Sequence, residues 1–268
     1  MKKRLTRPPV RNANIAITVG TPDAAPSSVP VSTLMMSPGR PVTRRTTPIE
    51  VTPPRREGKV VLRIPFSFLN RGNLCPIMST HRKPTREELL AAAGKTVPDV
   101  IAYGLKVLFC GINPGLYSAA TGHHFARPGN RFWPTLYNAG FTERLLSPAE
   151  ESELLKHGYG ITNLVERATA TAAELSAEEF VRGGERLAAK ASRYGPKYVA
   201  ILGVSAYRTA FNLPKAGLGR QSERVGDSVI WVLPNPSGLN AHYQPKDLAH
   251  LFLELKATVE EESRSEAS

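Results

Sequence analysis

The stretch LKVLFCGINPG, residues 105–115, carries an apolar run that leads directly into a loop shaped by glycine and proline. A second segment of this kind lies further along the chain, where Val229 to Leu233 precede Asn235-Pro236-Ser237-Gly238-Leu239-Asn240. Nearly continuous apolar runs are typical of strands covered on both faces of a parallel sheet. Ligands of open α/β sheets bind in the crevice at the carboxyl ends of the strands. We therefore predict that the two loops meet over one crevice.

These two loops bring amides, a hydroxyl, glycines and a leucine to the predicted crevice. No carboxylate occurs between Leu105 and Thr142, or between Ser228 and Lys246. A site of this composition can orient and stack a ligand, but it has no obvious acid/base pair. His123 and His124 have no cysteine or carboxylate at ligand spacing, so we predict neither a metal site nor a cofactor.

The rest of the folded part alternates between apolar strands and capped amphipathic helices. Helix starts are predicted at Thr85, Asn130, Ser147, Ser176, Ser205 and Asp247, with the last helix ending at Ala257. Further strands are predicted at residues 159–165 and 198–203, with a strand pair over 221–233, and residues 112–131 form a long loop. This alternation predicts a three-layer α/β/α sandwich with a central, mainly parallel sheet.

The first 77 residues differ in composition from the remainder. They hold thirteen lysine and arginine residues against three acidic ones, a net charge of +10, whereas the whole chain carries +12. They also hold 12 of the 23 prolines, so we predict a disordered basic tail that binds polyanions non-specifically. A solvated leader without a role is the alternative. Met78 also looks like a natural start, so residues 1–77 could equally reflect a start-site error.

We predict a catalytic domain over residues 78–258 and an acidic C-terminal tail over residues 259–268 that frays. Two cysteines do not make an extracellular disulfide framework, which favours a cytosolic protein. No stretch of 18 apolar residues occurs, so no membrane span is predicted.

Four segments, in order and spacing, resemble the mismatch-specific uracil-DNA glycosylases and their thymine-DNA glycosylase relatives. They are GINPG at 111–115, GHHF at 122–125, PGNRFW at 128–133 and NPSGL at 235–239. The resemblance implies the uracil-DNA glycosylase fold and a monomeric, monofunctional base-excision repair enzyme of the bacterial cytosol or nucleoid. It would excise uracil, with thymine and ethenocytosine as further candidate substrates, from double-stranded DNA with a G·U or G·T mismatch. The sequence leaves the preferred lesion open.

The resemblance also implies roles for individual residues. Asn113 matches the residue that positions the attacking water, and Phe125 matches the aromatic that stacks on the flipped base. Base edges would be recognised by backbone groups near Ile112 and Phe125. Ser118 would line the C5 side of the base. His124 would touch phosphate or a leaving-group oxygen, or serve as a structural histidine.

Leu239 matches the family's wedge, an apolar side chain that fills the gap left in the base stack. Asn235, Ser237, Gly238 and Asn240 surround it as candidate DNA contacts. Well-known bacterial members follow the wedge with Ser-Arg, whereas this chain has Ala241 in place of the arginine, so contacts to the opposite base are expected to be weaker. The classical uracil glycosylases place a histidine at the position of Asn235, so we expect a slower enzyme.

Two other classes remain as alternatives. One is a nucleotide- or phosphate-binding α/β module without hydrolysis, although the chain has neither Gly-x-Gly-x-x-Gly after a strand nor a phosphate-loop Gly-Lys-Ser/Thr. The other is a DNA-binding protein that acts through its basic arm alone, which would leave both polar loops unexplained.

Overall fold

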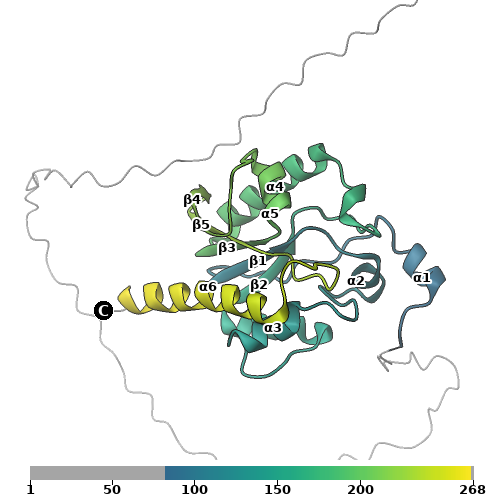
Figure 1. Cartoon of the computed structure of the whole chain (residues 1–268), viewed down its shortest axis with the longest axis horizontal. Coiled ribbons are helices and arrows are strands. Elements are labelled where there is room, and N and C mark those ends of the chain that lie inside the picture. Colours follow the sequence, from purple (N-terminus) through teal and green to yellow (C-terminus); the bar gives the residue numbers. More distant parts are fainter. Residues whose placement is uncertain (1–81, 267–268) are drawn as a thin grey trace, which may run out of the picture. The chain divides into compact units, whose positions relative to one another are not determined.

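The computed structural model describes residues 82–266 of the 268-residue chain. The predicted basic tail at residues 1–77 and Cys75 lie outside the described residues. The strands are β1 (Val107–Gly111), β2 (Tyr159–Asn163), β3 (Tyr198–Leu202), β4 (Gly219–Val225) and β5 (Ser228–Leu233). The helices are α1 (Arg86–Leu90), α2 (Leu116–Thr121), α3 (Phe132–Asn138), α4 (Ala177–Tyr194), α5 (Val204–Phe211) and α6 (Pro245–Ser265), with 3-10 turns η1 (Pro148–His157) and η2 (Ala172–Glu174) (Figure 1).

The five strands form one mostly parallel sheet in the order β2-β1-β3-β5-β4. Only β4 runs antiparallel to its neighbour, because a tight turn joins it to β5. Parallel neighbours need a crossover connection, and the helices between the strands supply it. The carboxyl ends of β1, β2, β3 and β5 therefore share one edge of the sheet, where Gly111 lies opposite Asn163.

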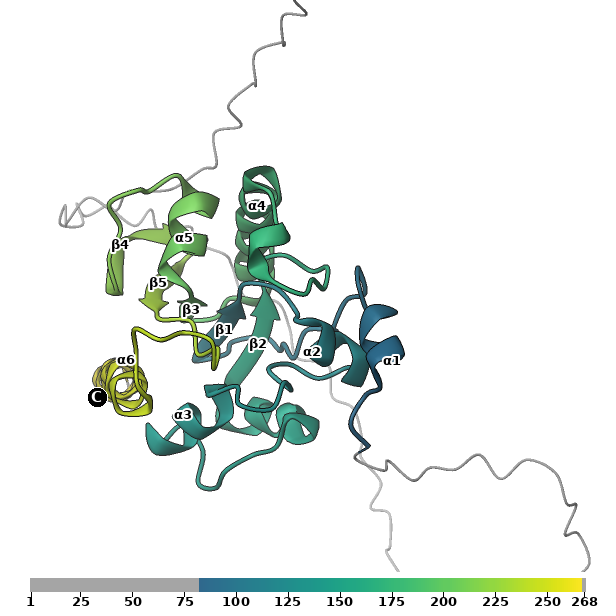
Figure 2. The same cartoon turned by 45° about the vertical axis from the view of Figure 1, so that its right-hand side comes forward.

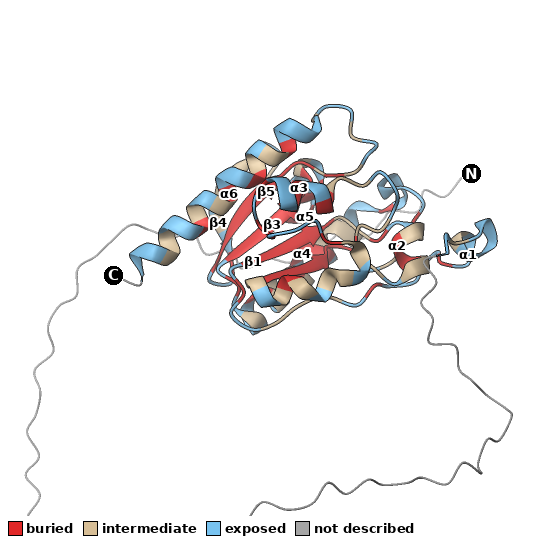
Figure 3. Ribbon diagram, turned by 90° about the horizontal axis from the view of Figure 1, so that it is seen from below, coloured by how far each residue is buried: buried red, intermediate tan, exposed pale blue. Residues whose placement is uncertain are grey.

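Helices cover both faces of the sheet, which confirms the predicted three-layer sandwich. Helices α3 and α6 lie on one face, while α4 and α5 lie on the other (Figure 2). Alternate residues of β3 point to opposite faces, with Tyr198 and Ala200 on the α3/α6 side and Val199 and Ile201 on the α4/α5 side. The strands β1, β2, β3 and β5 are consequently buried along their whole length (Figure 3), each large apolar side chain contributing roughly 1.5–3 kcal/mol.

Several predicted helix starts are confirmed by their hydrogen bonds. The Ser176 hydroxyl accepts from the backbone N–H of Glu179, while the Glu179 carboxylate accepts from the Ser176 N–H. The same capping box joins Thr85 to Glu88. Each box pairs backbone N–H groups that a helix terminus would otherwise leave without partners. The predicted start at Ser147 is also confirmed, although the element it begins is a 3-10 helix kinked at Glu150.

Several predicted boundaries are wrong. Helix α6 begins at Pro245 and is capped by Gln244, while Asp247, the predicted start, lies in its first turn and accepts from the Gln244 N–H. The long loop predicted over residues 112–131 contains helix α2, since Gly115 and Gly122 bracket a single short helical segment. The strand predicted over residues 159–165 ends at Asn163. Ser205 lies inside α5 instead of capping it, because Gly203, with φ of +148°, takes the capping position in a conformation that side chains disfavour.

The predicted acidic tail at residues 259–268 is wrong up to Ser265, because α6 continues through it. Val259 is buried in the core, and the Glu262 carboxylate accepts from the Tyr198 hydroxyl and pairs with Arg220. These contacts stabilise a segment that an acidic sequence alone would leave frayed. Within residues 82–266, no helix is both long and apolar enough to cross a bilayer.

Candidate functional site

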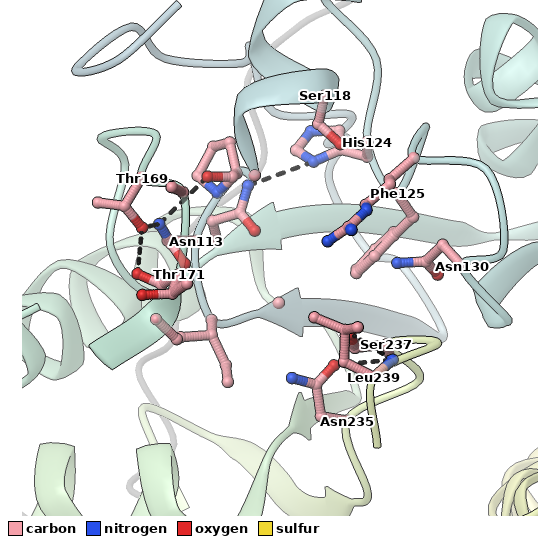
Figure 4. A pocket seen from close by; sticks show the side chains of 18 residues that line it. Asn113, Ser118, His124, Phe125, Asn130, Thr169, Thr171, Asn235, Ser237 and Leu239 are labelled. Atoms are coloured by element: carbon pink, nitrogen blue, oxygen red, sulfur yellow. Dashed lines mark hydrogen bonds between the residues drawn. The ribbon is translucent and has the colours of Figure 1, made fainter. Parts of the chain in front are cut away.

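A cavity of about 290 Å³ opens at the carboxyl edge of the sheet, between the loop after β1 and the loop after β5. Figure 4 shows its side chains converging from the two predicted loops, from α2 and from the segment after β2. The walls include Gly111, Asn113, Phe125 and Leu239, and no carboxylate of the described residues lines them. The sequence prediction that the two loops meet over one crevice is therefore confirmed.

The amide of Asn113 is held in one orientation (Figure 4). Its Nδ2 atom donates to Thr169 Oγ1 at 2.7 Å and to the carbonyl oxygens of Pro114 and Arg167 at 3.1 Å. The Thr169 hydroxyl donates its proton to the Thr171 carbonyl oxygen, so it can only accept a hydrogen bond from Asn113. No described residue donates to the Asn113 Oδ1 atom. This carbonyl oxygen is therefore a fixed acceptor in the wall of the cavity.

Phe125 forms an aromatic wall beside that acceptor. Its ring stacks on Phe132, with centroids 4.1 Å apart, and its backbone is left-handed, with φ of +52°. A non-glycine residue holds this conformation only when its surroundings fix it. Ser118 supplies one such restraint, because its hydroxyl accepts from the N–H of Ala126 at 3.1 Å. Ser118 thus lines the cavity and also supports the turn that presents Phe125.

Gly111 and Asn163 form the floor of the cavity. A Cβ atom at Gly111 would lie 2.6 Å from Asn163 Oδ1 and 3.1 Å from Phe125 Cζ, so a side chain here would displace both. The Ile112 carbonyl oxygen accepts a hydrogen bond from the Val165 N–H at 2.8 Å. Neither the Ile112 nor the Phe125 backbone N–H has a partner among residues 82–266. Both residues line the cavity, and neither donor is used within the described fold.

His124 is buried, and both of its ring nitrogens meet protein groups. Nε2 faces the Pro98 carbonyl at 2.9 Å, which can only accept, so Nε2 carries the proton. Nδ1 then accepts from Asn163 Nδ2 at 3.3 Å, which turns the Asn163 Oδ1 atom away from the ring. Burial lowers the pKa of His124 below its ordinary value, although Glu151 opposes the shift. The geometry favours a structural role over a direct phosphate contact.

This burial predicts a dependence of stability on pH. The unfolded chain takes up a proton at His124 near its ordinary pKa of 6.5, before the folded chain does. The contribution of neutral His124 to the free energy of unfolding is therefore fully present above about pH 6.5. It is lost as the pH falls through the lowered pKa of the folded state. His124→Gln should flatten this part of the profile of unfolding free energy, measured by urea titration between pH 7.5 and pH 5. His250→Gln, at an exposed histidine of α6, is the matched control. An unchanged slope in His124→Gln would contradict the assignment.

The loop after β5 is braced by its own side chains. Asn235 Oδ1 accepts from the N–H of Ser237, and Asn240 Nδ2 donates to the Asn235 carbonyl. The Ser237 hydroxyl accepts from the N–H of Leu239. Leu239 itself is 73% exposed at the cavity rim. Gly238 lies against the backbone of Gly129, where a Cβ atom would meet the Gly129 carbonyl oxygen at 2.4 Å.

The structure brings most of the predicted site residues to this one cavity. Ile112, Asn113, Ser118, His124, Phe125, Asn235, Ser237 and Leu239 all line it. Gly238 lies in an adjoining groove with Leu239, and Asn240 braces the loop from outside the cavity wall.

Sequence reasoning missed several residues of the site. Asn163 lies at the carboxyl end of β2, and the sequence prediction of a strand through Val165 gives no sign of its place in the site. Glu151 accepts from the His124 N–H and pairs with His123, which places a carboxylate behind the histidines. Thr169 and Thr171 fix Asn113 through a segment that carries no motif. Within residues 82–266, no group of three or more His, Cys, Asp or Glu side chains is placed to hold a metal ion.

Comparison with known proteins identifies the family of this chain. Residues 98–256 match the family model described as the uracil DNA glycosylase superfamily. The chain therefore belongs to the uracil DNA glycosylase superfamily. A solution NMR structure from Methanosarcina acetivorans, named "putative Uracil DNA glycosylase", is similar at 17% identity and a TM-score of 0.43. That match covers 61% of this chain and 98% of the other.

Proposed function

We propose that this protein is a monofunctional DNA glycosylase that flips uracil out of G-mismatched double-stranded DNA and excises it in base excision repair. Its immediate partner is then duplex DNA with a G·U or G·T mismatch, and the protein acts as a monomer without a cofactor. Superfamily membership supports the reaction class. The four motif segments at 111–115, 122–125, 128–133 and 235–239, which resemble those of the mismatch-specific members, support the mismatch preference.

In the proposed reaction, the flipped base enters the cavity and stacks on Phe125. Such stacking contributes roughly 1–3 kcal/mol and is insensitive to base identity. We expect the backbone N–H groups of Ile112 and Phe125, which make no hydrogen bond within the described residues, to donate to base oxygens. We expect Asn163 Oδ1 to accept from an imide N–H, which uracil and thymine carry and neutral cytosine lacks, because the contact of Asn163 Nδ2 with His124 fixes the orientation of this amide.

The bond that breaks joins the base nitrogen to C1′ of the sugar. The base leaves with the bonding electrons as an anion, and the sugar develops oxocarbenium character. Water held by Asn113 Oδ1 adds to C1′ and releases its proton to solvent. An amide can orient this water without removing a proton permanently, and a cavity without carboxylates suits a leaving group that departs as an anion.

The single observation that carries this proposal is the fixed amide of Asn113. Three acceptors hold its nitrogen, which leaves its oxygen as a preorganised acceptor in a cavity with an aromatic wall. Preorganised polar groups of this kind need no rearrangement at the moment of reaction.

A duplex with one G·U pair tests the proposal. The protein should release free uracil and leave an abasic site, whereas matched duplexes with thymine or cytosine should stay intact. A non-catalytic nucleotide- or DNA-binding module would bind such duplexes and leave every base in place. Parallel duplexes with G·T and ethenocytosine would rank the substrates that the sequence leaves open.

The N-terminal residues give a separate prediction. Deleting residues 1–77 removes a net charge of +10 and no part of the described core. The shortened protein should fold and cleave G·U duplex at the parental single-turnover rate. Because fewer phosphates are neutralised, it should bind DNA more weakly and with a shallower dependence on salt. Loss of folding or of chemistry would show that the proposed domain boundary near Met78 is wrong.

A further inference from the structure

One arginine holds the loop that carries Leu239. Arg131 lies at the start of α3, far in sequence from that loop, and its guanidinium binds three of the loop's backbone carbonyls. Nη1 donates to Tyr243 O at 2.6 Å, while Nη2 donates to Ser237 O at 2.5 Å and to Asn240 O at 2.7 Å. The Arg131 backbone N–H also donates to Pro236 O at 2.9 Å. A single residue thus fixes the loop at four points.

The Arg131 guanidinium makes no other hydrogen bond within the described residues. It forms no ion pair among residues 82–266, so its charge is met only by carbonyl dipoles. Its Nε atom is buried and has no hydrogen-bond partner within the described part of the chain. A planar guanidinium can reach several carbonyls from separate nitrogens, whereas a lysine ammonium acts as a single point. The chemistry at this position therefore requires arginine in particular.

The backbone of Gly129 also packs against this loop. Gly238 packs so closely on Gly129 that a Cβ atom there would lie 2.4 Å from the Gly129 carbonyl oxygen. With these two restraints on its loop, Leu239 is 73% exposed. Exposing the apolar side chain of Leu239 to water is unfavourable in free energy. The hydrogen bonds from Arg131 to the loop carbonyls keep the loop in this conformation before DNA binds.

We propose that Arg131 is the positioning residue of the wedge loop, keeping Leu239 in the conformation that enters the base stack. This inference rests on the proposed function. Arg131 acts through the loop carbonyls, so it touches neither the base nor the reacting sugar. Its loss should impair extrusion of the base and retention of abasic DNA, while the bond-breaking arrangement around Asn113 stays in place.

The test compares Arg131→Ala, Arg131→Lys, Leu239→Ala and the double variant Arg131→Ala/Leu239→Ala. Single-turnover release of uracil is measured on G·U duplex, A·U duplex and single-stranded DNA. Arg131→Ala should slow G·U cleavage about tenfold or more, the scale expected for losing charged hydrogen bonds. The loss should be larger on A·U duplex and smaller on single strands. Arg131→Lys should resemble Arg131→Ala, since charge alone does not reproduce the three contacts.

The double variant separates this role from general destabilisation. If Arg131 acts through Leu239, the losses will not add, and the double variant will cleave G·U duplex little more slowly than Leu239→Ala. Additive losses, equal losses on duplex and single strand, or full activity of Arg131→Lys would overturn the proposal. Arg208→Ala is the matched control, because Arg208 binds one loop carbonyl at a place remote from the cavity.

Two further measurements keep the outcomes distinct. Thermal unfolding checks each variant, and if Arg131→Ala does not fold, Gly238→Ala displaces the same loop and should give the same substrate pattern. If the parent protein releases uracil from none of the DNAs, the proposed function fails. Dissociation from a duplex with a tetrahydrofuran abasic analogue then decides the inference. Faster, non-additive dissociation in the Arg131 and Leu239 variants supports it, and unchanged dissociation contradicts it.

Discussion

Replacing Asn113 by alanine is expected to leave the binding of G·U duplex nearly unchanged and to slow uracil release about 100-fold or more. This range corresponds to the loss of one preorganised polar group. The substitution removes the Oδ1 acceptor that would hold the attacking water, while Phe125 and Leu239 remain to bind the flipped nucleotide. Single-turnover kinetics with enzyme in excess would measure the effect on chemistry, and fluorescence anisotropy would measure binding.

Asn138→Ala is the matched control, because Asn138 is an exposed asparagine at the end of α3. It should cleave at the parental rate. Asn113→Ala also removes three hydrogen bonds made by Nδ2, so thermal unfolding must accompany the kinetics. A folded Asn113→Ala protein with unchanged single-turnover cleavage would remove Asn113 from the mechanism.

Leu239→Ala is expected to have the second large effect, and its size should depend on how firmly the target base is stacked. Shortening the side chain leaves the gap in the duplex unfilled, which lowers the population of flipped base. We expect a loss on the order of tenfold for G·U, from the apolar surface removed, and a larger loss for the more stably paired A·U. Uracil in single-stranded DNA should be affected least. Release of abasic DNA should become faster.

Leu253→Ala provides the comparison, since Leu253 is an exposed leucine of α6 that lies outside the cavity. Rates on the G·U and A·U duplexes would be measured together with dissociation of the abasic product. An equal rate loss on both duplexes, with unchanged product dissociation, would reduce Leu239 to a packing residue.

The sequence was sufficient to predict the architecture and the two loops because both depend on local patterns. The apolar run before GINPG predicts a buried strand, and the alternation of strands and helices predicts the mainly parallel sheet. The capping boxes at Thr85 and Ser176 likewise each depend on only four consecutive residues of the sequence.

The residues that the sequence could not reveal act over long separations. Thr169 orients Asn113 from 56 residues away, and Arg131 binds the Asn240 carbonyl from 109 residues away. Neither partner belongs to a periodic pattern or a turn signal near the residue it supports. The continuation of α6 to Ser265 depends in the same way on contacts of Glu262 with Tyr198 and Arg220, which no local propensity encodes.

Chemistry at a G·U pair tests the central claim most directly. A labelled duplex with a single G·U pair would be incubated with an excess of the protein. Free uracil would be quantified, and alkali would cleave the strand at any abasic site. Uracil released in equal amount to strand breaks at that one position is the predicted result. A duplex that the protein binds but leaves intact, with no free uracil, would contradict the assignment of a glycosylase.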